Sequence, residues 1–253
     1  MRFGVCAPIS EAARLYKIGF DYVEVSAASL AAMTEEEFAA FCAENRAAPI
    51  HAEAANCLFP GEIRLTGDAV DTAAVQSYID RVMARLGDAG IGIAVFGSGG
   101  SRRVPEGFSE TRALEQLRDT ARRLGEAAAA HGVTVVLEPL RRAETNILNT
   151  QPESLAFVQS VGHPHFKLLC DYYHLVVEGG TPEMVAACGD ALRHVHIANP
   201  DGRVAMKPDD KADYKAFFDA LRRAGYDARV SFEGSASDYE AELPVALEVL
   251  RNA

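Results

Sequence analysis

Acids and a histidine that could bind a metal ion end four consecutive predicted strands. These residues are Glu138, Asp171, His196 and Glu233. Three carboxylates and one imidazole suit a divalent cation such as Mn²⁺, and to a lesser degree Mg²⁺, Co²⁺ or Fe²⁺. Zn²⁺ is also compatible, although it more often recruits additional His or Cys. One such Glu is more often a helix cap or an ion-pair partner. Four in succession predict a metal site, because each acid would otherwise need its own partner in a partly buried pocket.

Three further polar residues follow these predicted ligands at short spacings. Glu144 lies six residues after the first ligand, His174 three residues after the second, and Arg203 seven residues after the third. All three are expected on loops that follow strands, where they could hold the hydroxyl groups of a substrate. The alternative for Glu144 and Arg203 is a charge on a solvated loop.

Short apolar or β-branched runs alternate with longer amphipathic stretches along the whole chain, which predicts alternating strands and helices. Eight runs are predicted to be strands: Arg2–Cys6, Tyr22–Ser26, Pro49–Ala52, Gly92–Phe96, Val133–Glu138, Phe166–Asp171, His194–Ala198 and Arg229–Glu233. In the seventh run His194 and His196 project from one face, because side chains in a strand repeat every two residues.

Helix boundaries support this alternation. Ser109 is expected to cap a long helix that ends at His131 and Gly132, and Thr150 with Glu153 forms a capping-box pattern. Strands that alternate with helices must run parallel, and eight such units in 253 residues predict an α/β fold, a single (β/α)₈ TIM barrel spanning residues 1–253 as one domain. Active sites of such barrels lie at the carboxyl ends of the strands, where the predicted ligands would converge.

A doubly wound sheet is the structural alternative. It is less favoured, because no G-x-G-x-x-G motif follows the first predicted strand. The glycine-rich segment Gly97–Arg102 misses that spacing and is predicted to be a flexible loop after the fourth strand.

The composition favours a small-molecule partner. The net charge is −11, which disfavours binding to nucleic acid or to an anionic membrane surface. The five cysteines are odd in number and have no C-x-x-C spacing, so they are expected to be reduced thiols rather than a disulfide framework or a zinc ribbon. No apolar run reaches about 18 residues. We therefore expect a cytoplasmic protein that binds neither membrane nor nucleic acid.

Several motifs carry a family resemblance. The segments Leu137–Asn146, Asp171–His174 and His194–Asn199, with Asp213–Glu233 near the end of the chain, resemble the xylose isomerase-like TIM-barrel superfamily. Within it they resemble the sugar (phosphate) isomerase/epimerase branch, which includes ketose 3-epimerases of the tagatose/psicose type. The resemblance spans nearly the whole chain.

The resemblance implies roles for the residues already singled out. It assigns the four metal ligands to Glu138, Asp171, His196 and Glu233, and substrate contacts to Glu144, His174 and Arg203. Arg203 comes one residue later after the histidine than in the epimerases, and the segment Asn199–Gly202 departs from their pattern. The resemblance also implies a sugar or sugar-like substrate and a homodimer or homotetramer.

The implied reaction removes a proton next to a carbonyl to give an enediolate. Glu138 and Glu233 are the expected catalytic pair, one removing the proton and the other returning one on the opposite face. Ketose 3-epimerase activity is the main expectation, and aldose–ketose isomerisation would use the same groups. The alternatives are a metal-dependent dehydratase or lyase of the inosose or dehydroshikimate type and a non-catalytic sugar-binding barrel. A DNA-repair endonuclease is disfavoured by the negative charge and the scattered histidines.

Overall fold

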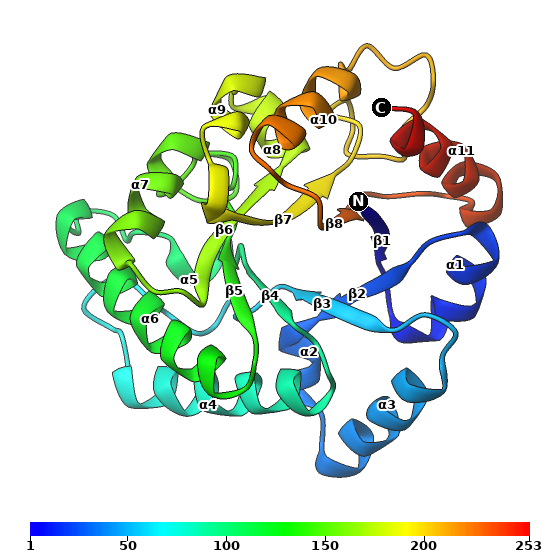
Figure 1. The fold of residues 1–253 in the computed structure, drawn as a ribbon. Helices are drawn as coiled ribbons and strands as arrows, with labels where there is room; N and C mark the ends of the chain where they lie inside the picture. Colours follow the sequence, from blue (N-terminus) through cyan, green and yellow to red (C-terminus); the bar gives the residue numbers. More distant parts are fainter.

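Eight parallel strands close into a barrel in the computed structural model, which describes residues 1–253 (Figure 1). Each strand pairs with the next along the chain, and β8 pairs with β1. The strands are β1 (Arg2–Cys6), β2 (Tyr22–Ser26), β3 (Ala52–Asn56), β4 (Ile93–Phe96), β5 (Thr134–Leu137), β6 (Phe166–Asp171), β7 (Leu192–Ile197) and β8 (Arg229–Phe232). The predicted TIM barrel is therefore confirmed.

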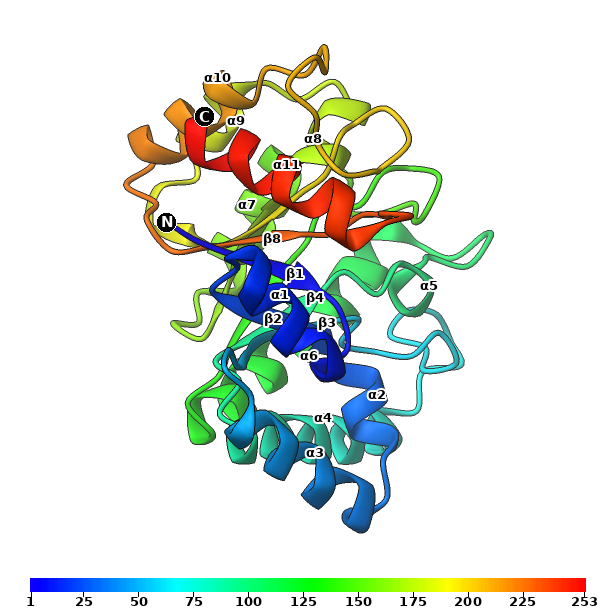
Figure 2. The ribbon, with the colours of Figure 1, turned by 90° about the vertical axis from the view of Figure 1, so that its right-hand side faces the viewer.

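Helices surround the barrel on its outer side (Figure 1). They are α1 (Ala12–Ile18), α2 (Ala27–Ala32), α3 (Glu35–Ala47), α4 (Thr72–Asp88), α5 (Gly99–Arg102), α6 (Glu110–Ala130), α7 (Gln151–Val161), α8 (Tyr172–Val177), α9 (Pro182–Ala186), α10 (Tyr214–Arg223) and α11 (Tyr239–Asn252), with 3₁₀ turns at Ile9–Glu11 and Gly189–Ala191. The first and last helices, α1 and α11, lie side by side (Figure 2). No helix is both long enough and apolar enough to span a membrane.

The local signals for helix ends are confirmed. Ser109 caps α6 by accepting from a backbone N–H, and Gly132 follows that helix with a φ of 69°. Thr150 and Glu153 form both hydrogen bonds of the capping box at the start of α7. These interactions are encoded within a few residues of sequence, so pattern alone could find them.

The predicted third strand is wrong in position. The run Pro49–Ala52 precedes β3, which begins at Ala52 and ends at Asn56. Residues 52–56 (AEAAN) are mostly small and lack the β-branched residues that mark strands by propensity. Pairing with the two neighbouring strands decides their conformation instead.

The predicted flexible loop at Gly97–Arg102 is also partly wrong. Its last four residues, Gly99–Arg102, form the short helix α5, and Arg102 is fully buried. The guanidinium of Arg102 donates to the backbone carbonyl of Glu138 at 2.8 Å and to that of Phe96 at 3.4 Å. This segment therefore ties the carboxyl ends of β4 and β5 together.

The barrel interior holds an apolar cluster of its own, separate from the large core between strands and helices. Its members are Tyr22, Ala54, Ile93, Val95, Val136 and Leu169. At the amino end of the barrel, Arg2 and Arg229 both pair with Glu53, at 2.6 and 2.7 Å. The polar residues predicted to do chemistry lie at the opposite, carboxyl end.

The inner cluster requires a glycine at position 4. A Cβ there would lie 2.4 Å from ring atoms of Tyr22, which is fully buried and is the register partner of Gly4 on the adjacent strand β2. We expect Gly4→Ala to lower the free energy of unfolding by about 1–3 kcal/mol, because the ring has no free space into which to move. Urea unfolding would measure this. Gly92→Ala is the matched control, since a Cβ there meets nothing within 4 Å. Equal stability of the two variants would contradict this packing.

Candidate functional site

The structure brings the four predicted ligands together at the carboxyl end of the barrel. One ligand atom from each of Glu138, Asp171, His196 and Glu233 lies within 4.8 Å of every other. Asp171 ends β6, His196 lies on β7 directly beside it in register, and the two glutamates follow the last residues of β5 and β8. We call these four residues the ligand cluster. Their metal-binding role remains a prediction.

His196 and Arg203 provide the positive charge of the ligand cluster. The Nδ1 atom of His196 lies 3.0 Å from Oε2 of Glu233 and 3.2 Å from Oε1 of Glu138. The Nη2 atom of Arg203 lies 2.6 Å from Oε2 of Glu233 and 3.2 Å from Oδ2 of Asp171. The predicted substrate-binding arginine thus reaches the same carboxylates as the imidazole.

Asp171 is oriented by the helix that follows it. Its Oδ1 atom caps α8 by accepting from the backbone N–H groups of Tyr173 at 2.7 Å and His174 at 3.3 Å. This N-cap leaves Oδ2 directed toward Arg203. One local motif therefore positions the predicted metal ligand and begins the helix that carries His174.

Glu138 lies in a tight space. Arg102 donates to the backbone carbonyl of Glu138, and Glu138 is 5% exposed. Gly97, at the end of β4, leaves room for its carboxylate, because a Cβ at position 97 would lie 2.3 Å from Oε2 of Glu138.

The two glutamates of the ligand cluster differ in how readily they hold a proton. Burial raises the pKa of Glu138, and the nearby Glu233 carboxylate raises it further. Burial also acts to raise the pKa of Glu233, but His196 and Arg203 outweigh it and lower that pKa. Burial acts to lower the pKa of His196, but the carboxylates of Glu24 and Glu233 outweigh it and raise that pKa well above its ordinary value. Opposite shifts in two neighbouring carboxyl groups are typical of an acid–base pair.

The three predicted substrate contacts border the ligand cluster. His174 is buried, and its Nδ1 accepts from the backbone N–H of Arg141 at 3.3 Å, so a neutral ring carries its proton on Nε2. That Nε2 has no hydrogen-bond partner and lies 3.7 Å from Oδ2 of Asp171 and 3.8 Å from Oε2 of Glu144. Glu144 also pairs with Arg141 at 2.7 Å and lies 3.8 Å from Arg203. His174 therefore offers a buried donor without a partner to a bound molecule.

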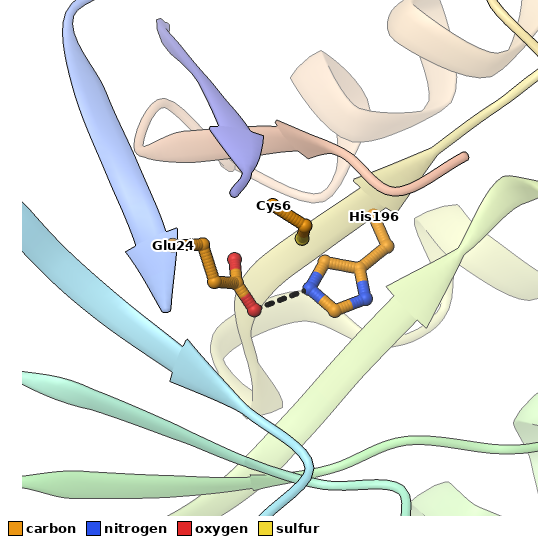
Figure 3. A group of neighbouring side chains, drawn as sticks. All are labelled: Cys6, Glu24 and His196. Atoms are coloured by element: carbon orange, nitrogen blue, oxygen red, sulfur yellow. Dashed lines mark hydrogen bonds and ion pairs between the residues drawn. The ribbon is translucent and has the colours of Figure 1, made fainter. Parts of the chain in front are cut away.

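Sequence reasoning missed two residues of this region. Glu24 on β2 accepts from Nε2 of His196 at 2.8 Å (Figure 3) and from Nε2 of His194, also at 2.8 Å. Asn56, which ends β3, donates to Oε1 of Glu233 at 3.3 Å. A glutamate between two valines in a predicted strand was the available signal for Glu24. Its burial acts to raise the pKa, but the two histidines outweigh this and hold the pKa well below its usual range.

The residues present fit a divalent cation. Three carboxylates and one imidazole nitrogen converge within 4.8 Å, and oxygen-rich sites with one nitrogen suit Mn²⁺ and similar ions. A cavity of about 380 Å³ is lined by Cys6, Glu24 and Asn56 together with mainly apolar residues that lie in or follow β1 and β2 and with Phe41 of α3. None of the four ligands lines it, and it approaches the ligand cluster through Glu24, which contacts His196, and Asn56, which contacts Glu233.

Comparison with known families supports the resemblance drawn from the motifs. A sequence model of the family described as xylose isomerase-like TIM barrel matches residues 12–253. The chain is similar to an L-ribulose 3-epimerase of Methylomonas sp. (strain DH-1), with 36% identity over 132 residues that cover 51% of this chain and 46% of that protein. It is 33% identical to a ketose 3-epimerase of Arthrobacter globiformis over 132 residues, which cover 51% and 45%. The chain thus spans about half the length of these curated relatives.

Solved structures share the fold. The crystal structure of a D-allulose 3-epimerase from Methylomonas sp. in complex with D-allulose superposes with a TM-score of 0.87 and 22% identity, covering 100% of this chain and 96% of that one. A 3-keto-D-glucoside 4-epimerase from E. coli gives a TM-score of 0.83 and 23% identity over 100% of both chains. At 22% and 23% identity, the similarity to these structures shows a shared barrel fold.

The space beside Glu138 leads to a prediction. Gly97→Ala is expected to displace the Glu138 carboxylate and to weaken Mn²⁺ binding by about tenfold or more, because outer groups that orient ligands have effects of this size. Isothermal titration calorimetry with MnCl₂ would measure the affinity. Gly100→Ala is the control, since its nearest neighbour would be 3.8 Å away. Unchanged binding by Gly97→Ala would contradict the expected displacement of the Glu138 carboxylate.

Proposed function

The chain belongs to the xylose isomerase-like TIM-barrel family, and we propose that it is a divalent-metal-dependent sugar isomerase that epimerises a ketose at C3. The observation that carries this proposal is the pair of carboxylates from Glu138 and Glu233. Both lie within 3.2 Å of one atom, Nδ1 of His196, although they follow strands at different points of the barrel. Two carboxyl groups around one point suit removal of a proton by one and donation of a different proton by the other.

Glu138, Asp171, His196 and Glu233 are the residues that would hold the cation. Mn²⁺ is the ion we propose, because three carboxylates and one imidazole match its preferences, and Mg²⁺, Co²⁺, Fe²⁺ or Zn²⁺ are alternatives. A cation bound there supplies Lewis-acid stabilisation of the negative charge that develops on the substrate oxygens.

Proton transfer is assigned to the two glutamates. Glu233, whose pKa is lowered, is ionised and suited to remove the proton next to the carbonyl. Glu138, whose pKa is raised, more readily holds the proton that is returned to the opposite face. In the reverse direction the two residues exchange roles.

Substrate positioning is assigned to the groups that border the ligand cluster. The Nε2–H of His174 is a buried donor without a protein partner, so it can donate to a substrate oxygen. Glu144 and Arg203 offer an acceptor and a cation within 3.8 Å of each other. The cavity of about 380 Å³ lined by Glu24 and Asn56, which contact His196 and Glu233, has room for the remaining carbons of a sugar. Together these contacts would decide which carbon faces the glutamates.

We further propose a cytoplasmic location and assembly as a homodimer or homotetramer. All five cysteines are free in the structure, which agrees with a reducing compartment. Light scattering of the purified protein would test the assembly.

The central experiment is proton exchange in D₂O with added Mn²⁺ across a panel of ketoses and their phosphates. NMR is expected to find deuterium at C3 together with the inverted product. Exchange at C1 or C2 would instead identify an aldose–ketose isomerase, and loss of water would identify a dehydratase. Bound metal and bound sugar without any exchange would overturn the enzymatic proposal in favour of a sugar-binding barrel.

Glu233→Gln tests the two-carboxylate pair. Exchange is expected to fall by about 10²–10⁴-fold, because an amide cannot accept the proton. Glu126→Gln, at an exposed position on α6, is the matched control and should keep the original rate. Near-normal exchange by Glu233→Gln would rule out this residue as the base.

Glu144→Ala separates substrate binding from metal binding. KM is expected to rise by about tenfold, since the loss of one charge-assisted hydrogen bond costs roughly 1.5–3 kcal/mol at most. The Mn²⁺ affinity should stay within about twofold, because Glu144 is not part of the ligand cluster. Loss of Mn²⁺ from this variant would show that Glu144 binds the metal ion rather than the substrate.

A further inference from the structure

One buried carboxylate at the base of the ligand cluster accepts hydrogen bonds from three side chains. Oε1 of Glu24 lies 2.8 Å from Nε2 of His196, and Oε2 lies 2.8 Å from Nε2 of His194 and 2.5 Å from Oγ of Ser231. Glu24 is 1% exposed, and both histidines and Ser231 are fully buried. The three partners come from β7 and β8, so Glu24 contacts them across the inside of the barrel, and Figure 3 shows its contact with His196.

The two ring nitrogens of His196 face different groups. Nδ1 faces Glu138 and Glu233 of the ligand cluster, whereas the carboxylate that Nε2 faces is that of Glu24. A carboxylate can only accept, so the bond to Glu24 keeps a proton on Nε2. The nitrogen that can give up its proton to a cation is then Nδ1, on the side of the other ligands.

We infer that Glu24 is a positioning residue, which holds the His196 ring so that Nδ1 faces a divalent cation and Nε2 keeps its proton. This inference rests on the proposed metal-dependent function and adds a residue that does not itself touch the metal. A carboxylate on the far nitrogen of a ligand histidine fixes the ring orientation and raises the basicity of the ligand.

The surroundings of Glu24 are built to keep its carboxylate in place. Ser231, which contacts Oε2, is itself held by the hydroxyl of Tyr22 at 2.7 Å. Cys6 lies beside both Glu24 and His196, with ligand-type atoms of the three within 4.8 Å of one another (Figure 3). The donors on His194, His196 and Ser231 already occupy the carboxylate oxygens of Glu24. We therefore interpret this second group as the support of the ligand cluster rather than as a separate metal site.

Substitution of Glu24 by glutamine removes one acceptor. The carboxylate offers an oxygen to each imidazole, whereas an amide offers one oxygen and one NH₂ group. The NH₂ group would face an N–H of His194 or His196, and that ring would have to turn or move its proton to Nδ1. Glu24→Met keeps a similar side-chain length and removes both acceptors.

The experiment measures Mn²⁺ binding by the full chain with isothermal titration calorimetry. Glu24→Gln is expected to weaken the affinity by about 10–100-fold, and Glu24→Met at least as much. Pulsed EPR of bound Mn²⁺ provides a second readout, because the ¹⁴N coupling of the single histidine ligand changes when its ring turns. A general loss of stability would not change the ¹⁴N coupling in the protein molecules that remain folded.

His194→Gln is the matched control. Its amide NH₂ can replace the Nε2–H donor to Glu24, and His194 is not in the ligand cluster. Its Mn²⁺ affinity should therefore stay within about threefold of the original. Equal weakening of Mn²⁺ binding by His194→Gln and Glu24→Gln would overturn the specific role of Glu24, because any disturbance of the buried network would then weaken Mn²⁺ binding.

Further outcomes separate this inference from the proposed function. Normal Mn²⁺ affinity and an unchanged ¹⁴N coupling in both Glu24 variants would overturn the inference while leaving sugar epimerisation intact. If the original protein binds Mn²⁺ but exchanges no sugar proton, the proposed activity fails and the affinities still decide the role of Glu24. If both variants fail to fold, Glu24→Asp decides, because it keeps the buried charge but withdraws it by one methylene. At least tenfold weaker binding supports the inference, and unchanged binding overturns it.

Discussion

The imidazole of His196 joins two groups of acids in the mouth of the barrel, and the arrangement of the site depends on it. Nδ1 lies within 3.2 Å of Glu138 and Glu233, and Nε2 lies 2.8 Å from Glu24. Buried carboxylates are costly unless they are paired and hydrogen-bonded. His196 supplies positive charge to both groups, with Arg203 as a second cation on the outer side. A divalent cation in the ligand cluster would add to this compensation.

The two-residue repeat of the strands explains how one barrel holds an apolar interior below a polar mouth. On β2, Tyr22 belongs to the inner apolar cluster, and Glu24, two residues later, reaches the histidines. Glycines create the space that these side chains need, since a Cβ at Gly4 would meet Tyr22 and a Cβ at Gly97 would meet Glu138. The packing below the mouth and the chemistry at the mouth are therefore coupled through the same strands.

Much of this architecture could be predicted from local patterns. The helix caps at Ser109 and Thr150 and most strand positions follow from interactions within a few residues. The third strand could not be placed in this way, because its alanine-rich segment has weak strand propensity and is fixed by pairing with its neighbours. The glycine-rich sequence of α5 likewise predicts a flexible loop, because the contacts that order it come from other strands. The burial of Arg102 depends on backbone carbonyls from two different strands.

The sequence by itself determined the barrel and the residues that reach its carboxyl end, because strand period and element order place Glu138, Asp171, His196 and Glu233 at that end whatever their exact contacts. Only the tertiary structure decided which partner each one meets. Glu24 and His196 are 172 positions apart in the chain and meet because β2 and β7 face each other across the closed barrel. Closure is a long-range property. No local pattern could assign Glu24 to His196 or show that His174 is a buried donor without a partner.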